Sequence, residues 1–167
     1  MRHTEIIVLR LFQEEFPLCP RPFLELACRA NRGFCRPRTV YLEVLGPGSK
    51  RRAVVARHKV RPISEREVIA AAVSLVRRGQ VRRIAGIFAP RSDAAPGSTS
   101  WRIMKELEGG LPLVPEPYRE LSRRVGVREE ELIERIRALR QEGRLRRLGA
   151  VFGPPASTRP AGKGGGG

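Results

Sequence analysis

The feature that most constrains the fold of this 167-residue chain is an internal repeat. Residues 16–26, FPLCPRPFLEL, return as residues 111–121, LPLVPEPYREL, at an offset of 95. Farther along, residues 65–88 return as residues 129–152 at an offset of 64. Self-similarity on this scale indicates that one supersecondary unit occurs twice, so we expect two small modules built on the same plan.

The two offsets differ because the first copy holds a 31-residue insertion, which falls within residues 31–62. Two β-prone runs, residues 39–45 and 51–58, flank a Gly-Pro-Gly turn in this insertion. This pattern suggests a basic β-hairpin. The flanking segments are rich in proline and arginine and are equally compatible with disorder, so both interpretations stay open.

Each copy carries the same order of local signals. An apolar pattern of helical period, within residues 6–12 and again within 101–107, predicts a first helix. A proline-rich corner then ends that helix and places Pro22 or Pro117 in the first turn of a second one, where the missing N–H does no harm. A third helix over residues 129–142 is expected to end at Gly143, before a short strand of the kind that forms a wing.

These elements read as a winged helix-turn-helix unit. The predicted fold class is therefore mainly α with short β, as tandem winged helix-turn-helix modules with a possible β-hairpin insertion in the first. The expected domains are residues 1–91, with the insertion at about 31–62, and residues 98–153. Residues 154–167 are low in complexity and are expected to form a flexible tail.

The chain is strongly basic, with a formal net charge of +16. Only four of its 33 basic residues are lysine, so 29 are arginine, which suits bidentate capture of carboxylate or phosphate. A GC-rich coding bias explains the same composition equally well. No apolar run reaches the ~20 residues of a membrane-spanning helix and no signal peptide is evident, so we expect a cytoplasmic protein that does not enter a membrane.

The candidate site residues are the two Arg-Arg pairs, Arg82 with Arg83 and Arg146 with Arg147, together with His58 in the insertion. Because side chains alternate along a strand, each pair is expected to send one arginine to either face. We predict binding of a substrate or another anion at these positions. The competing interpretation is that the arginines cover apolar surface with their stems and stay solvated.

The sequence assigns no catalytic residue. Neither histidine has metal-ligand spacing, no glycine-rich phosphate loop occurs, and the three cysteines lack a paired C-x-x-C, so no metal site and no resident cofactor are expected. The third helices begin with carboxylates, at Glu65 and Glu67 and again at Glu129, Glu130 and Glu131. Such a helix start would meet the phosphates of DNA unfavourably.

The proline corner and the strand motif also carry a family resemblance. Residues 16–23 with residues 79–88, and residues 111–118 with residues 146–152, resemble the helix-turn-helix part of siroheme decarboxylases, which are Lrp/AsnC-related proteins of haem d1 and alternative haem biosynthesis. The resemblance implies decarboxylation of the acetate side chains of siroheme, an anionic tetrapyrrole, by a carboxy-lyase that forms a homo- or heterodimer. In that family an α/β ligand domain follows each helical module, and this chain has no segment that matches it.

Three hypotheses follow. The chain is a siroheme decarboxylase-family subunit, inactive alone, that needs a partner or a missing ligand domain. Alternatively, it is an Lrp/AsnC-type transcriptional regulator that binds DNA through its basic insertion and wings. As a third possibility, it is a non-catalytic dimerisation piece of a haem-synthesis complex.

Overall fold

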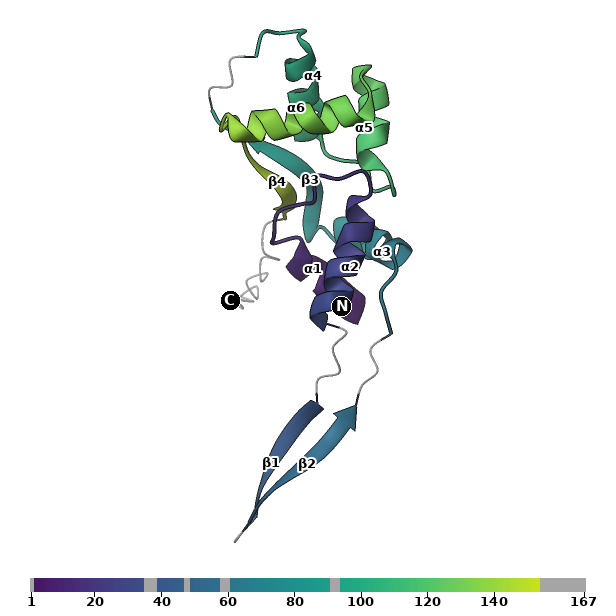
Figure 1. The fold of residues 1–167 in the computed structure, drawn as a ribbon, viewed down its shortest axis with the longest axis vertical. Helices are drawn as coiled ribbons and strands as arrows, with labels where there is room; N and C mark the ends of the chain where they lie inside the picture. Colours follow the sequence, from purple (N-terminus) through teal and green to yellow (C-terminus); the bar gives the residue numbers. More distant parts are fainter. Residues whose placement is uncertain (1, 35–38, 47–48, 58–60, 91–93, 154–167) are drawn as a thin grey trace, which may run out of the picture.

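The structure is a computed structural model that describes residues 2–34, 39–46, 49–57, 61–90 and 94–153 (Figure 1). The first copy contains α1 (His3–Leu11), α2 (Pro22–Phe34), β1 (Thr39–Gly46), β2 (Ser49–Arg57), α3 (Glu65–Arg77) and β3 (Val81–Phe88). The second contains α4 (Thr99–Gly109), α5 (Pro117–Val125), α6 (Glu129–Gln141) and β4 (Leu145–Phe152). The predicted fold class is confirmed: the chain is mainly helical with short strands, and the elements of both copies follow in the same order.

The ends of the helices lie close to the predicted positions. Pro22 and Pro117 each occupy the first position of a second helix. The Ser98 hydroxyl accepts a hydrogen bond from the Trp101 backbone N–H and caps α4. Gly143, with φ of 74°, follows the C-cap of α6, since a left-handed residue there is readily supplied by glycine.

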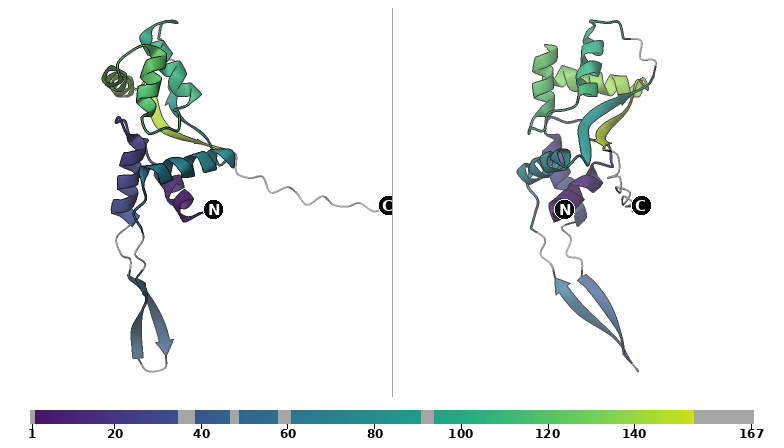
Figure 2. Two further views of the ribbon diagram at one scale, coloured as in Figure 1. Left: turned by 90° about the vertical axis from the view of Figure 1, so that its right-hand side faces the viewer. Right: turned by 180° about the vertical axis from the view of Figure 1, so that it is seen from behind.

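The insertion of the first copy forms the predicted β-hairpin. Strands β1 and β2 pair antiparallel from Thr39 opposite Arg57 to Gly46 opposite Ser49, with one irregularity after Val40. The hairpin lies apart from the helices in both side views (Figure 2). His58 and the tail, residues 154–167, lie outside the described residues, and what the sequence indicates for them stays a prediction.

The strands of the two copies pair with each other and not within their own modules. Strand β3 runs antiparallel to β4, with Val81 opposite Phe152, Ala85 opposite Gly149 and Gly86 opposite Leu148. The expectation of a separate wing in each module missed this pairing. The physical reason is that a single short strand leaves its backbone N–H and C=O groups unpaired along both edges. When β3 and β4 lie side by side, each strand pairs the backbone groups along one edge with those of the other.

The pairing follows a pseudo-twofold axis that passes close to Ala85 and Gly149. Backbone hydrogen bonds outside the strands obey the same symmetry: Phe16 N–H donates to the Leu148 carbonyl at 2.9 Å, and the equivalent Leu111 N–H donates to the Ile84 carbonyl at 2.7 Å. Each proline corner is thereby attached to the strand of the opposite copy. The helices of the first copy lie on one side of this sheet and those of the second on the other (Figure 1).

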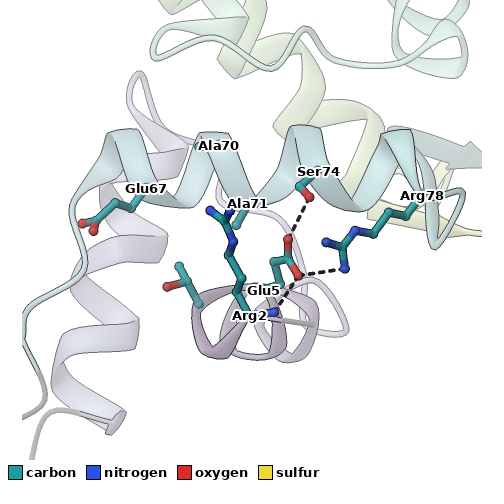
Figure 3. A pocket seen from close by; sticks show the side chains of 8 residues that line it. Arg2, Glu5, Glu67, Ala70, Ala71, Ser74 and Arg78 are labelled. Carbon is teal, nitrogen blue, oxygen red and sulfur yellow. Dashed lines mark hydrogen bonds and ion pairs between the residues drawn. The ribbon is translucent and has the colours of Figure 1, made fainter.

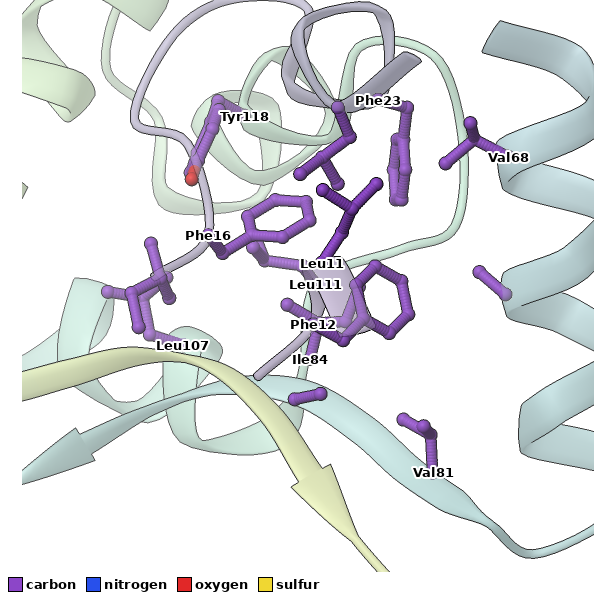
Figure 4. Packing of buried hydrophobic residues seen from close by; sticks show 14 of the residues in the cluster. Leu11, Phe12, Phe16, Phe23, Val68, Val81, Ile84, Leu107, Leu111 and Tyr118 are labelled. Atoms are coloured by element: carbon purple, nitrogen blue, oxygen red, sulfur yellow. The ribbon is translucent and has the colours of Figure 1, made fainter. Parts of the chain in front are cut away.

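One continuous apolar core joins the two copies (Figure 4). The Phe16 ring packs edge-on against Phe23, with centroids 5.4 Å apart, and close to Tyr118 of the second copy. The Tyr118 ring is fully buried, and its hydroxyl donates to the Pro17 carbonyl at 2.8 Å. Since the core is shared, the proposed division between residues 91 and 98 stays a prediction.

Candidate anion-binding site

The two Arg-Arg pairs lie at opposite ends of the shared sheet, each beside an irregularity in the strand register. Arg83 lies opposite Val151 and Arg147 lies opposite Ile87, while the register skips Arg82 and Arg146. A bulge of this kind adds one residue without a partner and interrupts the alternation of side chains. Arg82 and Arg83 are both exposed, and the expected split of each pair between the two faces stays a prediction.

Arg82 and Arg83 line a hollow of about 210 Å³ between β3 and the corner that follows α4. Within the part of the chain that the structure describes, neither guanidinium makes a hydrogen bond or an ion pair. A third arginine, Arg124 of α5, joins them, and no acidic residue is among the described residues that line the hollow. The floor is apolar and consists of Val76, Ile84, Leu111, Pro112 and Leu113.

A second hollow, of about 470 Å³, opens on the outer face of the shared sheet. Ala85, Ile87 and Val151 line it, and Ile87 is 44% exposed. Arg83 lines both hollows. This second hollow therefore combines a small apolar face with one cation, Arg83, and one carboxylate, Glu108, whereas arginines are the only charged residues among the described ones that line the first hollow.

The second Arg-Arg pair has different surroundings. Arg147 is half-buried, and its guanidinium donates to the Gln13 carbonyl at 2.8 Å. Arg146 is exposed and forms no hydrogen bond or ion pair within the described residues. Of the four sequence candidates on the strands, one is thus used to hold the two copies together, and three remain available to a ligand.

The carboxylates at the starts of the third helices have structural roles. Glu65 forms an ion pair with Arg21, the residue that precedes α2. Glu67 accepts hydrogen bonds from the backbone N–H and the hydroxyl of Ser64, which hold the pKa of its carboxyl below the usual value. In the second copy, desolvation followed by repulsion from Glu116 and Glu130 raises the pKa of Glu129. These groups stabilise or strain helix ends and do not form a surface that attracts nucleic acid.

A buried carboxylate, that of Glu5, lies in another hollow of about 280 Å³ between α1 and α3 (Figure 3). Glu5 is 3% exposed, and it accepts hydrogen bonds from the Arg2 N–H at 2.8 Å and the Ser74 hydroxyl at 2.7 Å. The Arg78 guanidinium lies 3.3 Å from the same carboxylate. Because its charge is matched within the fold, we assign Glu5 to the attachment of α1 to α3 and not to ligand binding.

The Glu5 contacts predict an acid-sensitive fold. The Arg2 N–H, then the Ser74 hydroxyl and Arg78, lower the pKa of Glu5 below its ordinary 4.5. A lowered pKa stabilises the folded chain above pH 4.5, and this stability is lost as the pH falls through the folded-state pKa. Melting temperatures measured from about pH 7 to about pH 3 should fall less steeply for Glu5→Gln than for the wild type. Equal slopes for the two proteins would contradict this assignment.

The sequence predicted two of the three arginines that line the two hollows beside β3, Arg82 and Arg83, and missed Arg124. Arg124 lies in the repeated segment at the position of Arg29 in the first copy, so a comparison of charges between the two copies would have drawn attention to it. Among the described residues, no group of three or more histidine, cysteine or acidic side chains is placed to hold a metal ion. None of the described helices has the length and apolar character needed to cross a membrane.

Comparison with known proteins gives a consistent result for the second copy. Residues 101–146 match the family model of the siroheme decarboxylase NirDL-like HTH domain. Over 51 residues the chain is 41% identical to the siroheme decarboxylase alpha subunit of Desulfovibrio desulfuricans, a match that covers 30% of each chain. Over 53 residues it is 40% identical to the siroheme decarboxylase NirD subunit of Pseudomonas aeruginosa, covering 32% of this chain and 35% of that one.

The fold has a counterpart among solved structures. The crystal structure of the siroheme decarboxylase NirDL in co-complex with an iron-uroporphyrin III analogue superposes with a TM-score of 0.62, covering 89% of this chain and 66% of the other, at 18% identity. At that identity the likeness establishes the fold alone. The sequence matches span about a third of the length of the curated relatives, so they describe a module and not a whole enzyme.

Proposed function

We propose that this chain, whose helix-turn-helix portion belongs to the siroheme decarboxylase family, serves as a subunit of a siroheme decarboxylase and presents arginines to a carboxylate of the tetrapyrrole. The observation that carries the proposal is the match of the second copy to that family's helix-turn-helix domain. Arg82 and Arg83 at the start of β3 support the proposal. They have no partner among the described residues, and guanidinium groups bind carboxylates through paired hydrogen bonds.

The side chains present indicate which part of the reaction this chain would carry out. Loss of an acetate carboxyl group as carbon dioxide requires that the other carboxylates of the substrate be held while one is left to react. Arg82 and Arg83 are suited to holding, since arginine stays protonated at any physiological pH and does not transfer protons. They are positioning residues in this proposal, and the groups that act on the departing carboxyl would come from elsewhere.

A partner subunit is the natural source of those groups. The relatives carry names such as alpha, beta, NirD, NirG and NirL subunit, so siroheme decarboxylases occur as multi-subunit proteins. The sequence similarity of this chain to them is confined to about 30% of their length. We therefore propose a complex in which a second chain, identical or different, supplies the remainder of the tetrapyrrole site.

Titration with siroheme under anaerobic conditions tests the proposal. We expect the absorption spectrum of siroheme to shift on addition of the chain, and carbon dioxide to be released once a siroheme decarboxylase partner subunit is added. Replacing Arg82 with alanine should weaken binding by about tenfold, since it removes a charge-assisted hydrogen bond. Absence of a spectral shift and of carbon dioxide with every partner would overturn the proposal.

The same titration separates the other two hypotheses. A dimerisation piece would form the complex with its partner and give no turnover that depends on Arg82. A DNA-binding regulator would bind duplex DNA with an affinity that falls steeply with salt. The acidic starts of α3 and α6, and the use of both strands in the shared sheet, disfavour DNA binding, and a salt-dependent duplex affinity would reverse that ranking.

A further inference from the structure

The residues that line the first hollow, here called the first cleft, have repeat-related equivalents in the other copy, here called the second cleft, and the charges of the two sets differ. In the first cleft, Arg82, Arg83 and Arg124 surround the corner at Gly109 and Gly110. The repeat aligns these positions with Arg146, Arg147 and Arg29, and it aligns the two glycines with Glu14 and Glu15. One cleft therefore has a glycine pair at the place where the other has two carboxylates.

The carboxylates of the second cleft are engaged with its own cations. Glu15 forms an ion pair with Arg140, a residue whose equivalent in the first cleft is the apolar Val76. Glu14 lies 3.9 Å from Arg29, which also binds Glu25 at 3.1 Å. Together with the bond from Arg147 to the Gln13 carbonyl, these contacts occupy Arg29, Arg140 and Arg147, and of the cations in this set only Arg146 has no partner among the described residues.

In the described part of the first cleft, by contrast, most of the arginines have no acidic neighbour. Arg124 has one acidic neighbour, Glu106, at 3.6 Å, while Arg82 and Arg83 have none among the described residues. Gly110 adopts φ of 114° and leaves room beside Arg83, whose Cβ would lie 3.2 Å from any Cβ at position 110. The cleft thus combines three cations from two elements with space that a side chain at position 110 would take up.

We infer that the chain has one anion site, in which Arg82, Arg83 and Arg124 bind a single carboxylate of a polycarboxylate ligand, and that Glu14 and Glu15 close the equivalent cleft. The hollow of about 210 Å³ is smaller than the pockets of roughly 300–1,000 Å³ that enclose drug-sized ligands, so it admits one acidic substituent with its methylene stem and not a whole macrocycle. The apolar floor of Val76 and Leu111 suits such a stem. The inference rests on the proposed function only for the identity of the polycarboxylate.

Citrate and metal-free uroporphyrin III serve as the probes. Citrate is followed through the backbone amide resonances of the full chain, and uroporphyrin through its absorption. We expect one citrate per chain, with the largest shifts at Gly109, Gly110 and Leu111. Gly109→Glu should weaken both ligands by about tenfold or more, since it restores the carboxylate of the closed cleft. Gly109 accepts a side chain because a Cβ there meets nothing within 4 Å.

Equivalent positions provide matched controls. Arg124→Ala should weaken citrate binding by about tenfold, whereas Arg29→Ala should change it by less than about twofold. The double variant Glu14→Gly with Glu15→Gly should raise the stoichiometry from one to two. Equal losses for Arg29→Ala and Arg124→Ala, two sites in the wild type, or no citrate binding would overturn the inference. Citrate binding without carbon dioxide release from siroheme would overturn the proposed function and leave this site intact.

Discussion

Replacing Tyr118 with alanine is expected to lower the free energy of unfolding by about 3–5 kcal/mol, the range found when a large buried aromatic side chain is removed. Tyr118 is fully buried, and it belongs to the second copy while its hydroxyl binds the Pro17 carbonyl of the first. The loss should appear in a single urea unfolding transition of the whole chain, because both copies share one core.

A conservative variant separates packing from hydrogen bonding at this site. Tyr118→Phe keeps the ring and leaves the buried Pro17 carbonyl without its donor, so it should lower the free energy of unfolding by about 1–3 kcal/mol. The first copy has Phe23 at the equivalent position and needs no such donor. Two separate unfolding transitions, or a Tyr118→Ala chain as stable as Tyr118→Phe, would contradict the shared core.

Phe16→Ala is the second change with a large expected effect, again about 3–5 kcal/mol in the free energy of unfolding. The Phe16 ring packs against Phe12 and Phe23, with centroid distances of 6.4 and 5.4 Å. Its own backbone N–H is bound to the Leu148 carbonyl, so loosening of the ring also weakens the attachment of the first corner to β4. Denaturant unfolding followed by circular dichroism measures the loss.

A control for Phe16 lies in the second proline corner. Val114 is 38% exposed, and Val114→Ala should change the free energy of unfolding by less than about 1 kcal/mol, since little buried surface is lost. If Phe16→Ala and Val114→Ala lowered the free energy of unfolding by equally small amounts, the packing of the proline corners between the two copies, as described above, would be wrong.

Much of the fold is predictable from the sequence because the signals are local. Proline at the start of a helix, as at Pro22 and Pro117, and glycine beyond its end, as at Gly143, act through the backbone of a few neighbouring residues. The insertion hairpin was predicted in the same way, from two β-prone runs around a turn. The repeat itself then indicated that both halves share one plan.

The pairing of the strands was not predictable in that way. Strands β3 and β4 have nearly the same pattern, VRRIAGIF and LRRLGAVF, and an alternating strand does not specify which other strand lies beside it. The register bulges at Arg82 and Arg146 depend on that pairing. The simple alternation expected within each Arg-Arg pair took no account of these bulges.

The candidate site was predicted in part. The Arg-Arg pairs were identified as candidates because of their charge, but as two equal sites. Their difference depends on Glu14 and Glu15 in one copy and Gly109 and Gly110 in the other, just before the segment in which the repeat is most evident. These residues are far from the arginines in sequence, and only the crossed attachment of the corners brings them together.

The pseudo-twofold axis divides the positions of the chain into two evolutionary classes. At Ala85 and Gly149 the two copies lie opposite each other in the sheet, and a Cβ at position 149 would lie 3.2 Å from the Arg147 side chain. Away from the axis each ancestral position exists twice in separate surroundings. One copy can then hold a structural ion pair, as at Glu15 and Arg140, while the equivalent positions of the other copy hold the uncharged Gly110 and Val76. Duplication followed by such divergence gives an asymmetric protein from a symmetric plan.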